Sequence, residues 1–438
     1  MGIKVLKFGG SSLADSAQFK KVRDIILSDP ERRFIVASAP GKRNKGDIKV
    51  TDMLYKCYDL AASGNDPGPA LKGIRERFAE IIKELSISFD IDTEIDSLKA
   101  QLTKAPEKEF TASRGEYLNS RVLAAYLDLP FIDAAELIFF RADGRLDSEK
   151  TYSTIKKRLT GLPGAVIPGF YGSMPDGRIH TFSRGGSDVS GSIVACGIDA
   201  SLYENWTDVS GMLSADPRIV DDPAGIGVIT YRELRELSYM GASVLHEDAV
   251  FPVKWAGIPI NIRNTNAPSD NGTMIVPHLP QGDRGNVITG IAGKKGFAEV
   301  TVTKSLMNGE VGFGAKLLTI FADEGVPFEH CPTGIDTMSV VVNEEKFNSA
   351  EEMILARIRD ELKPDEIEIE RGFAMVAVVG QRMASTVGTA CRVTGALKNA
   401  GVNIRMIDQG SSELNIILGI EEADYEKTVR AIYKEFFS

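Results

Sequence analysis

The sequence lacks any apolar run near the ~18 residues that a membrane-spanning helix needs. Its four cysteines, Cys57, Cys196, Cys331 and Cys391, form no CxxC pair, which predicts reduced thiols and excludes a disulfide framework. The four histidines stand at unrelated spacings and give no metal-ligand pattern. A strand pattern starts at Ile3 and no signal-peptide pattern precedes it, so we expect a cytoplasmic protein.

A surplus of basic residues is also missing. The 438 residues include 51 Lys and Arg against 61 Asp and Glu, a net charge of −10. This balance argues against nucleic acid or an anionic membrane as the main partner, but allows a local basic site for a phosphorylated small molecule. The length predicts two or three domains, and a hydrophobic content of 43% is that of an ordinary globular protein.

Residues 1–285 alternate short apolar runs with amphipathic stretches. The predicted strands are 3–8, 33–39, 129–135, 164–172, 200–208 and 258–264. The predicted helices are 16–28, 52–62, 70–85, 114–127, 149–160 and 187–197. This alternation predicts an α/β fold with a mostly parallel sheet sandwiched by helices, in which ligands bind at the carboxyl ends of strands.

The rest of the chain contains an internal repeat with a spacing of 76 residues. FAEVTV at 297–302 matches FAMVAV at 373–378, and Gly312 matches Gly388. Each copy reads strand, helix, strand, strand, helix. Residues 365–370 can close the first copy and residues 286–293 the second, which predicts two intertwined βαββαβ units with the first inserted in the second.

Short polar motifs follow the predicted strands or open the predicted helices. They are KFGGSSLA at 7–14, SRGEYLNS at 113–120, FSRGGSDVSG at 182–191 and TDVSGMLSADPR at 207–218. Glycines such as Gly9 and Gly10 let backbone amides approach a phosphate at a helix start, although this motif taken alone favours a plain tight turn. Arg184 offers a planar fork for a carboxylate or phosphate. Asp208 is either a turn former or an oxygen ligand for nucleotide-bound Mg²⁺, and Glu116 in a first helical turn is explained by the helix dipole alone.

In order and spacing these motifs resemble those of aspartate kinases, and the C-terminal repeat looks like the two ACT domains of that family. The resemblance covers essentially the whole chain. It implies an amino acid kinase domain at 1–285, a first ACT domain at 297–371, and a second formed by 286–296 and 372–438. The implied reaction is phosphorylation of the β-carboxylate of L-aspartate by MgATP to give 4-phospho-L-aspartate. That reaction is the first step of lysine, threonine and methionine biosynthesis.

The resemblance also implies roles for the residues at matching positions, with Lys7 and Asp188 as the catalytic pair. The ATP-binding residues would be Lys7, Phe8, Gly9, Gly10, Ser11, Thr207, Asp208, Leu213 and Arg218. The aspartate-binding residues would be Ser38, Thr51, Glu116, Arg184, Gly185, Gly186 and Ser187. Glu116 would take the α-ammonium and Arg184 the α-carboxylate. Mg²⁺ would arrive with ATP, and no side chain is assigned to it as a ligand.

The adenine side departs most from the family pattern. Leu213 stands where many members have tyrosine, Ser210 replaces a common proline, and Ser243 occupies the place of a lysine that often reaches the nucleotide. Arg218 is the first candidate to hold the nucleotide instead.

Feedback inhibition is expected from the first repeat, where residues 305–316 lead into a helix near Gly312 whose amides could receive an effector carboxylate. An ordinary glycine-rich helix start explains the same pattern. Acidic side chains favour lysine as the effector, with threonine and concerted inhibition left open. The effector residues would be Met307, Glu310, Phe313, Gly314, Ala315, Glu329, Thr333 and Asp336. By resemblance, ACT units pair into at least a homodimer, and a tetramer stays open.

Two other functions compete with this interpretation. One is an amino-acid sensor in which the kinase-like body no longer turns over. The other is a different acyl-phosphate-forming amino acid kinase. A free α-amino acid substrate needs the Glu116 carboxylate, whereas an N-acetylated substrate has no ammonium for it.

Overall fold

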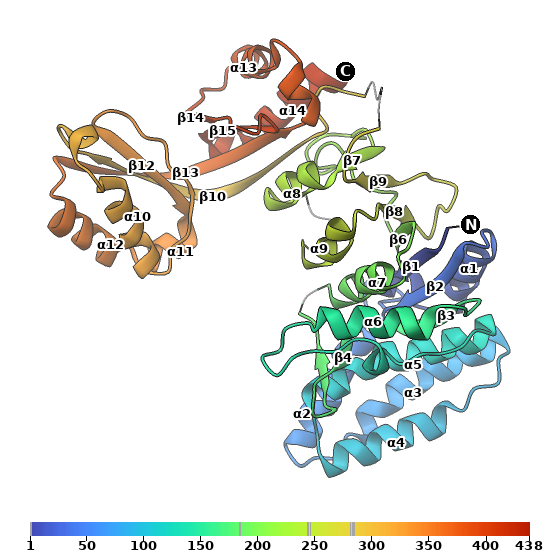
Figure 1. The fold of residues 1–438 in the computed structure, drawn as a ribbon. Coiled ribbons are helices and arrows are strands. Elements are labelled where there is room, and N and C mark those ends of the chain that lie inside the picture. Colours follow the sequence, from blue (N-terminus) through green and yellow to red (C-terminus); the bar gives the residue numbers. More distant parts are fainter. Residues whose placement is uncertain (1, 184, 243–244, 246, 281, 283–284) are drawn as a thin grey trace. The chain divides into compact units, whose positions relative to one another are not determined.

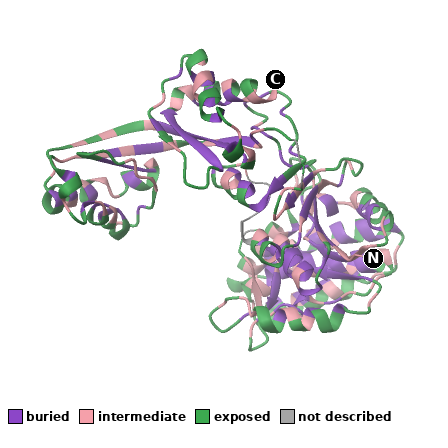
Figure 2. Cartoon of the chain, turned by 45° about the horizontal axis from the view of Figure 1, so that its top comes forward, coloured by how far each residue is buried: buried purple, intermediate pink, exposed green. Residues whose placement is uncertain are grey.

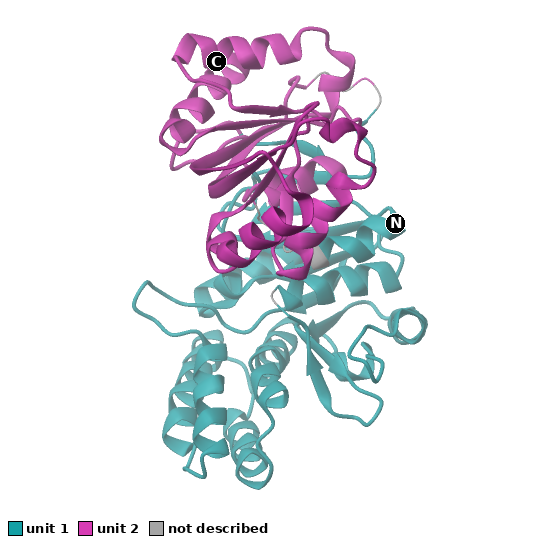
Figure 3. Ribbon diagram, turned by 90° about the vertical axis from the view of Figure 1, so that its left-hand side faces the viewer, with its two compact units in different colours: residues 1–212, 225–231, 244–281 teal, residues 213–224, 232–243, 282–438 magenta. Residues whose placement is uncertain are grey.

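The computed structural model describes residues 2–183, 185–242, 245, 247–280, 282 and 285–438 (Figure 1). Their contacts divide the chain into two compact units (Figure 3). Unit 1 comprises Met1–Met212, Gly225–Tyr231 and Val244–Gln281, and unit 2 comprises Leu213–Ala224, Arg232–Ser243 and Gly282–Ser438. Two segments that the sequence placed with residues 1–285, namely 213–224 and 232–243, therefore pack in unit 2.

Unit 1 is built on a sheet with the strand order β3-β2-β1-β6-β8-β9-β7. Neighbouring strands pair in parallel except β8 with β9, as the predicted fold class requires. The strands are β1 (Lys4–Phe8), β2 (Arg32–Ala37), β3 (Ala165–Pro168), β6 (Leu202–Thr207), β7 (Val228–Thr230), β8 (Ile260–Asn264) and β9 (Thr273–Val276). A separate hairpin consists of β4 (Tyr171–Ser173) and β5 (Ile179–Thr181).

Each predicted helical stretch lies on a helix of unit 1, although the helix predicted at 114–127 begins six residues earlier. They are α1 (Ser16–Leu27), α2 (Val50–Ala62), α3 (Gly68–Leu85), α4 (Ile91–Lys104), α5 (Lys108–Leu127), α6 (Ser148–Leu159), α7 (Gly186–Gly197) and α9 (Glu247–Ala256). The predicted strand at 129–135 is wrong. Only Phe131 forms an isolated bridge, to Val166, and Asp133 then caps a short 3₁₀-helix at Ala134–Glu136.

Two helical layers explain why the strands are buried along most of their length (Figure 2). Leu6 and Phe8 of β1 belong to the core that also contains apolar residues of α1 to α5. Side chains alternate across a strand, so Lys7 points to the opposite face. There α7 contacts β1, β2 and β6, and Gly191 of α7 lies directly against Tyr203. The alternation of β1 thus delivers Lys7 to the layer that contains α7.

Unit 2 contains a second sheet, with the strand order β11-β12-β10-β13-β15-β14. Its strands are β10 (Gly290–Thr303), β11 (Phe328–His330), β12 (Thr337–Asn343), β13 (Glu366–Val379), β14 (Met406–Asp408) and β15 (Asn415–Glu421). Its helices are α8 (Tyr231–Tyr239, apart from its first residue), α10 (Phe313–Asp323), α11 (Glu344–Asn348), α12 (Glu351–Arg357), α13 (Thr389–Ala400) and α14 (Tyr425–Phe437).

The two long strands β10 and β13 intertwine the repeats. The first half of β10 pairs with the second half of β13, from Gly290 opposite Val379. The second half of β10 pairs with the first half of β13, up to Thr303 opposite Glu366. Each copy of the repeat therefore receives its closing strand from the segment that the sequence indicated.

The repeat is visible in the backbone at the start of one helix in each copy. Gly312 has φ 87° before α10, and Gly388 has φ 88° before α13. A side chain at either position would be strained, because L-residues rarely adopt this left-handed conformation. The matching glycines thus maintain the same sharp entry into both helices.

Candidate active site

Polar segments meet at the carboxyl edge of the parallel strands in unit 1. The amide of Gly9, just after β1, donates to Trp206 O of β6 at 3.0 Å. The amide of Ser38, just after β2, donates to Phe8 O at 3.1 Å. The glycine turn and the Ser38 turn therefore lie next to one another where ligands of such sheets bind.

The structure brings Lys7 and Asp188 together. Lys7 Nζ lies 2.6 Å from Asp188 Oδ1, and the two side chains are only 10% and 16% exposed. Asn205, the register partner of Lys7 on β6, donates its Nδ2–H to the same oxygen at 2.7 Å. Asp188 belongs to the first turn of α7. A largely buried ammonium at a strand end is suited to approach a phosphate when its carboxylate partner shifts.

Glu116 is buried in the third turn of α5. The predicted helix start at residue 114 is wrong by six residues, because α5 begins at Lys108, and the helix-dipole explanation therefore fails. A Cβ at Gly115 would lie 2.8 Å from Ala39 Cβ, so glycine lets α5 approach the turn after β2. Ala39 N–H then donates to the Glu116 carboxylate.

The Glu116 carboxylate is incompletely satisfied. Its Oε2 has no hydrogen-bond partner among the described residues. Burial raises the pKa of Glu116 from an ordinary 4.5 to about 7. One turn further along α5, Asn119 donates to Ser38 O at 2.7 Å and fixes the same turn. A buried carboxylate with an open oxygen is a fitting partner for an ammonium group.

The other predicted aspartate-binding residues lie on two helices. Gly185 is the N-cap of α7, and Gly186 and Ser187 are buried in its first turn. Thr51 lies in the first turn of α2 and is half-buried. Arg184, predicted to bind the α-carboxylate, lies outside the described residues.

Some of the predicted ATP-binding residues can offer only backbone groups to a nucleotide, and one of those groups already has a hydrogen-bond partner in the protein. The Phe8 ring is buried and stacks on Trp206 with centroids 6.0 Å apart, so only its backbone can face a nucleotide. The Gly9 amide, expected to be free for phosphate, is used by Trp206 O. Gly10 and Ser11 open a 3₁₀-helix, Gly10–Leu13, and helix starts leave their first amides without helical partners.

The predicted nucleotide-binding residues from the end of β6 onward belong to both units. Thr207 O accepts from Thr265 N at 2.9 Å, and Asp208 is exposed, both in unit 1. Leu213, 40% exposed, and Arg218 belong to unit 2. The Arg218 guanidinium contacts both carboxylate oxygens of Asp216, at 2.6 Å for the closer one, and a nucleotide would compete with that pair.

The predicted effector residues lie around the loop between β10 and α10 and on β11. Asp336 accepts from Leu306 N at 2.9 Å, beside Met307, which is buried in the core of the first copy. The carboxylate of Glu310 is paired with Lys304, so an ammonium already occupies it. Glu329 accepts a hydrogen bond from Tyr239 of α8.

The remaining predicted effector residues surround the start of α10 and the following loop. Phe313 is the first residue of α10, and its N–H donates weakly to Glu310 O at 3.3 Å. Gly314 and Ala315 follow in the first turn. Thr333 donates its hydroxyl to Cys331 O at 3.1 Å.

Sequence reasoning missed two side chains of this site, Asn119 and Asn205. Both stand inside motifs or strands that were recognised, and a period of two along 202–207 would have placed Asn205 on the face of Lys7. Among the described residues no cluster of His, Cys, Asp and Glu could hold a metal ion. In the same residues no helix combines the length and apolarity of a membrane span.

Comparisons with known proteins agree with this arrangement. Residues 2–264 match the amino acid kinase family model, and residues 376–436 match an ACT domain model. The chain is 41% identical to Aspartokinase 3 of Bacillus subtilis, over 100% of this chain and 99% of that protein. It is 30% identical to the chloroplastic Aspartokinase 1 of Arabidopsis thaliana, over 99% of this chain and 80% of that protein.

Solved structures extend the likeness to three dimensions. The aspartate kinase of Clostridium acetobutylicum is 51% identical, with a TM-score of 0.91 over 100% of both chains. The aspartokinase III of E. coli, solved with aspartate and ADP, has a TM-score of 0.72 over 100% of both chains. Because the sequence identity to this second structure is only 24%, the similarity supports a shared fold and nothing more.

Proposed function

This chain belongs to the aspartokinases of the amino acid kinase family, and we propose that it transfers the γ-phosphoryl group of ATP to the β-carboxylate of L-aspartate. The product is 4-phospho-L-aspartate. One observation carries the proposal: the carboxyl edge of one parallel sheet holds both a largely buried ammonium, Lys7, and a buried carboxylate with an open oxygen, Glu116.

The reaction needs charge neutralisation more than it needs a base. The β-carboxylate of aspartate is ionised at neutral pH and is itself the nucleophile. The difficulty is to bring this anion against the anionic γ-phosphate. Lys7 at the end of β1 would neutralise the transferring phosphoryl group, and the amides of Gly10 and Ser11 would add dipoles. Glu116 would hold the substrate by its α-ammonium.

Asp188 and Asp208 are the carboxylates that suit Mg²⁺ carried by ATP. Mg²⁺ prefers oxygen ligands and usually binds one or two carboxylates together with phosphates. Asp188 Oδ1 accepts from Lys7 and Asn205, and Asp208 is exposed directly after β6. When bound, the ion would neutralise charge on the phosphates.

A substrate panel tests the reaction. ADP release from ATP should depend on L-aspartate and should be far slower with N-acetyl-L-aspartate, because the acetylated nitrogen carries no charge for Glu116. Equal rates with both would contradict the role of Glu116. An absence of ADP release with either compound would favour a chain that binds amino acids without phosphorylating them.

The pH profile of aspartate recognition should report the Glu116 carboxyl. Its pKa of about 7 means that the free enzyme is increasingly protonated at this position below neutrality, and the proton must leave before an ammonium can pair. We expect KM for aspartate to rise by up to ~10-fold per pH unit between pH 7 and pH 5 and to level above pH 7.5.

Steady-state kinetics at fixed saturating ATP measure this profile. Glu116→Gln should have a flat KM profile over the same range, because its amide does not titrate. A wild-type KM that stays constant from pH 7 to pH 5.5 would contradict the assignment.

We further propose that lysine inhibits the enzyme by binding the first ACT unit, residues 297–371. Asp336 accepts from the amide of Leu306 in the loop that leads to α10, whose first amides could take the effector's carboxylate, and Glu329 supplies a second carboxylate on β11. Glu310 contributes less than the sequence suggested, because Lys304 neutralises it. Lysine, with its second ammonium, fits this acidic surrounding better than threonine does.

Helix α8 gives this site a route to the kinase part of the chain. Its Tyr239 hydroxyl donates to Glu329 of the first copy, and its Glu236 accepts from Asn415 of the second copy at 2.7 Å. An ammonium arriving at Glu329 would compete with the Tyr239 hydroxyl. In the sequence α8 is followed by α9 of unit 1, and this order makes α8 our candidate for the element through which lysine affects the kinase.

Glu329→Gln and Asp336→Asn should each raise the lysine concentration for half-inhibition by about tenfold or more, in line with allosteric couplings of ~1–3 kcal/mol. Uninhibited turnover should stay within about twofold. Glu413→Gln, an exposed acid in the second copy, is the matched control and should leave inhibition unchanged. Inhibition by threonine alone, with lysine inert at millimolar concentration, would overturn the lysine assignment.

The remaining proposals follow from the family. We propose the domains as 1–285 for the kinase, although 213–224 and 232–243 pack in unit 2, 297–371 for the first ACT unit, and 286–296 with 372–438 for the second. The enzyme acts in the cytoplasm at the first step of lysine, threonine and methionine biosynthesis, as at least a homodimer through its ACT units. Size-exclusion chromatography with light scattering measures the assembly, and a monomer at micromolar concentration would contradict it.

A further inference from the structure

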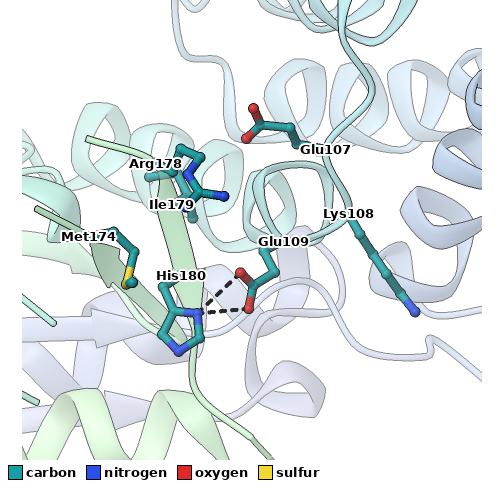
Figure 4. A pocket seen from close by; sticks show the side chains of 7 residues that line it. All are labelled: Glu107, Lys108, Glu109, Met174, Arg178, Ile179 and His180. Carbon is teal, nitrogen blue, oxygen red and sulfur yellow. Dashed lines mark hydrogen bonds and ion pairs between the residues drawn. The ribbon is translucent and has the colours of Figure 1, made fainter. Parts of the chain in front are cut away.

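The carboxylate of Glu109 binds the β4–β5 hairpin to the first turn of α5. His180 Nδ1 lies 3.0 Å from Glu109 Oε1 and 3.1 Å from Oε2 (Figure 4). The Thr181 hydroxyl donates to Oε1 at 3.1 Å, and the Thr181 amide donates to the same oxygen at 3.3 Å. An ionised carboxylate only accepts, so the His180 Nδ1 must carry the hydrogen in this contact.

Both elements that Glu109 joins lead directly to the substrate residues. Glu109 and Glu116 are seven residues apart on α5, which places them two turns apart on the same face. On the other side, Thr181 ends β5, and the chain then runs through Phe182 to Gly185, the N-cap of α7. The described residues Gly185 and Gly186 at the start of α7 therefore follow closely in the chain after the residue that Glu109 holds.

The hairpin is also packed against one aromatic side chain. Phe140 contacts the His180 ring edge-to-face with centroids 4.6 Å apart and the Phe182 ring at 5.0 Å. The Phe182 amide donates to Phe170 O at 2.9 Å. These contacts fix where the hairpin lies in its layer, and the Glu109 carboxylate is the polar link that sets its position along α5.

We propose that Glu109 is a positioning residue for the amino-acid substrate: it sets the distance between the α5 carboxylate Glu116 and the segment that enters α7. The inference rests on the proposed aspartate kinase function. Glu109 does not touch the substrate. It acts through Thr181 and His180, so its removal should loosen aspartate recognition and leave the ATP side unaffected.

Three variants separate this role from a general effect on folding. Glu109→Ala removes the whole link. Glu109→Gln retains an acceptor oxygen for the two Thr181 donors. Glu107→Ala removes a neighbouring carboxylate that lines the same pocket and caps no backbone amide, and it serves as the matched charge control (Figure 4).

The experiment measures KM for aspartate, KM for ATP, kcat and the melting temperature of each variant. Glu109→Ala should raise KM for aspartate by about tenfold, with KM for ATP and kcat within about twofold. Glu109→Gln should recover most of the loss, and Glu107→Ala should match the wild type. Should Glu109→Ala fail to fold, Thr181→Val removes one donor with little change in shape and should raise KM for aspartate about threefold.

Two results would overturn the inference. The first is an unchanged KM for aspartate in Glu109→Ala. The second is a parallel loss of ATP affinity, kcat and melting temperature, which marks a purely structural role. If the wild type shows aspartate-dependent turnover and a variant gives either of these results, only the role of Glu109 is refuted. If the wild type shows no such turnover, the proposed function is refuted as well.

Discussion

Lys7→Ala should lower kcat by about 10²-fold or more, with KM for aspartate within a few fold of the wild type. The Lys7 ammonium is largely buried at the end of β1, where it pairs with Asp188, whose carboxylate also accepts from Asn205. A preorganised charge in such a site acts mainly on charge that develops in the transition state. Its loss therefore falls on turnover, and steady-state kinetics with both substrates measure it.

Lys4→Ala provides the matched control for this prediction. Lys4 begins the same strand, but its ammonium pairs with Asp29 at 2.6 Å, at the other end of β1. Turnover of Lys4→Ala should stay within about twofold of the wild type. If Lys7→Ala retains most of its turnover, or if both lysine variants lose it equally, Lys7 does not act on the phosphoryl group.

Glu116→Gln should raise KM for aspartate by about 10²-fold. The wild-type carboxylate is buried and has an open Oε2, and a substrate ammonium there would form a largely desolvated charge pair. Truncating one partner of such a pair costs ~2–5 kcal/mol. Glutamine has nearly the same shape and can still accept from Ala39 N, so folding should be preserved.

KM for ATP separates this prediction from a general disturbance of the site. It should stay within about twofold in Glu116→Gln, because the proposed contact involves only the amino acid. Thermal unfolding should show no loss of stability, since the substitution removes a buried group whose charged form is disfavoured. If Glu116→Gln lost affinity for ATP but kept its affinity for aspartate, the assignment of Glu116 to the aspartate ammonium would be wrong.

Much of the fold follows from local patterns. Strong periodicity over 16–28 and 187–197 predicts α1 and α7 to within a residue, and the repeat of 76 residues predicts the pairing of β10 with β13. The run 129–135 resembles a strand because most of its residues are apolar, but Pro130 has no amide to donate and Asp133 already caps a short 3₁₀-helix. Only Ile132 N and Pro130 O pair with the neighbouring Val166 there.

Burial at the site could not be predicted in the same way. The sequence marked Glu116 as important but placed it in a first helical turn, where it would have been a surface residue. The earlier start of α5 at Lys108 places it in the interior, and that changes its pKa and its chemistry. The burial of a side chain such as Glu116 depends on packing between segments that are distant in the sequence, here the close approach of Gly115 to Ala39.

Local sequence patterns also could not predict that residues 213–224 and 232–243 pack in unit 2. Residues such as Ala215 and Ile219 belong to a core with strands β13 and β15. An amphipathic pattern shows that one face is buried, but not which sheet covers it. The contact of Tyr239 with Glu329 likewise joins residues 90 positions apart.

Trapping of the acyl phosphate by hydroxylamine tests the central claim most directly. The purified full chain is incubated with ATP, Mg²⁺ and L-aspartate, and aspartyl hydroxamate is measured beside ADP. The account predicts hydroxamate and ADP in equal amounts, dependent on aspartate and lost in Lys7→Ala. ADP release without hydroxamate, or hydroxamate formed only with another carboxylic acid, would contradict it.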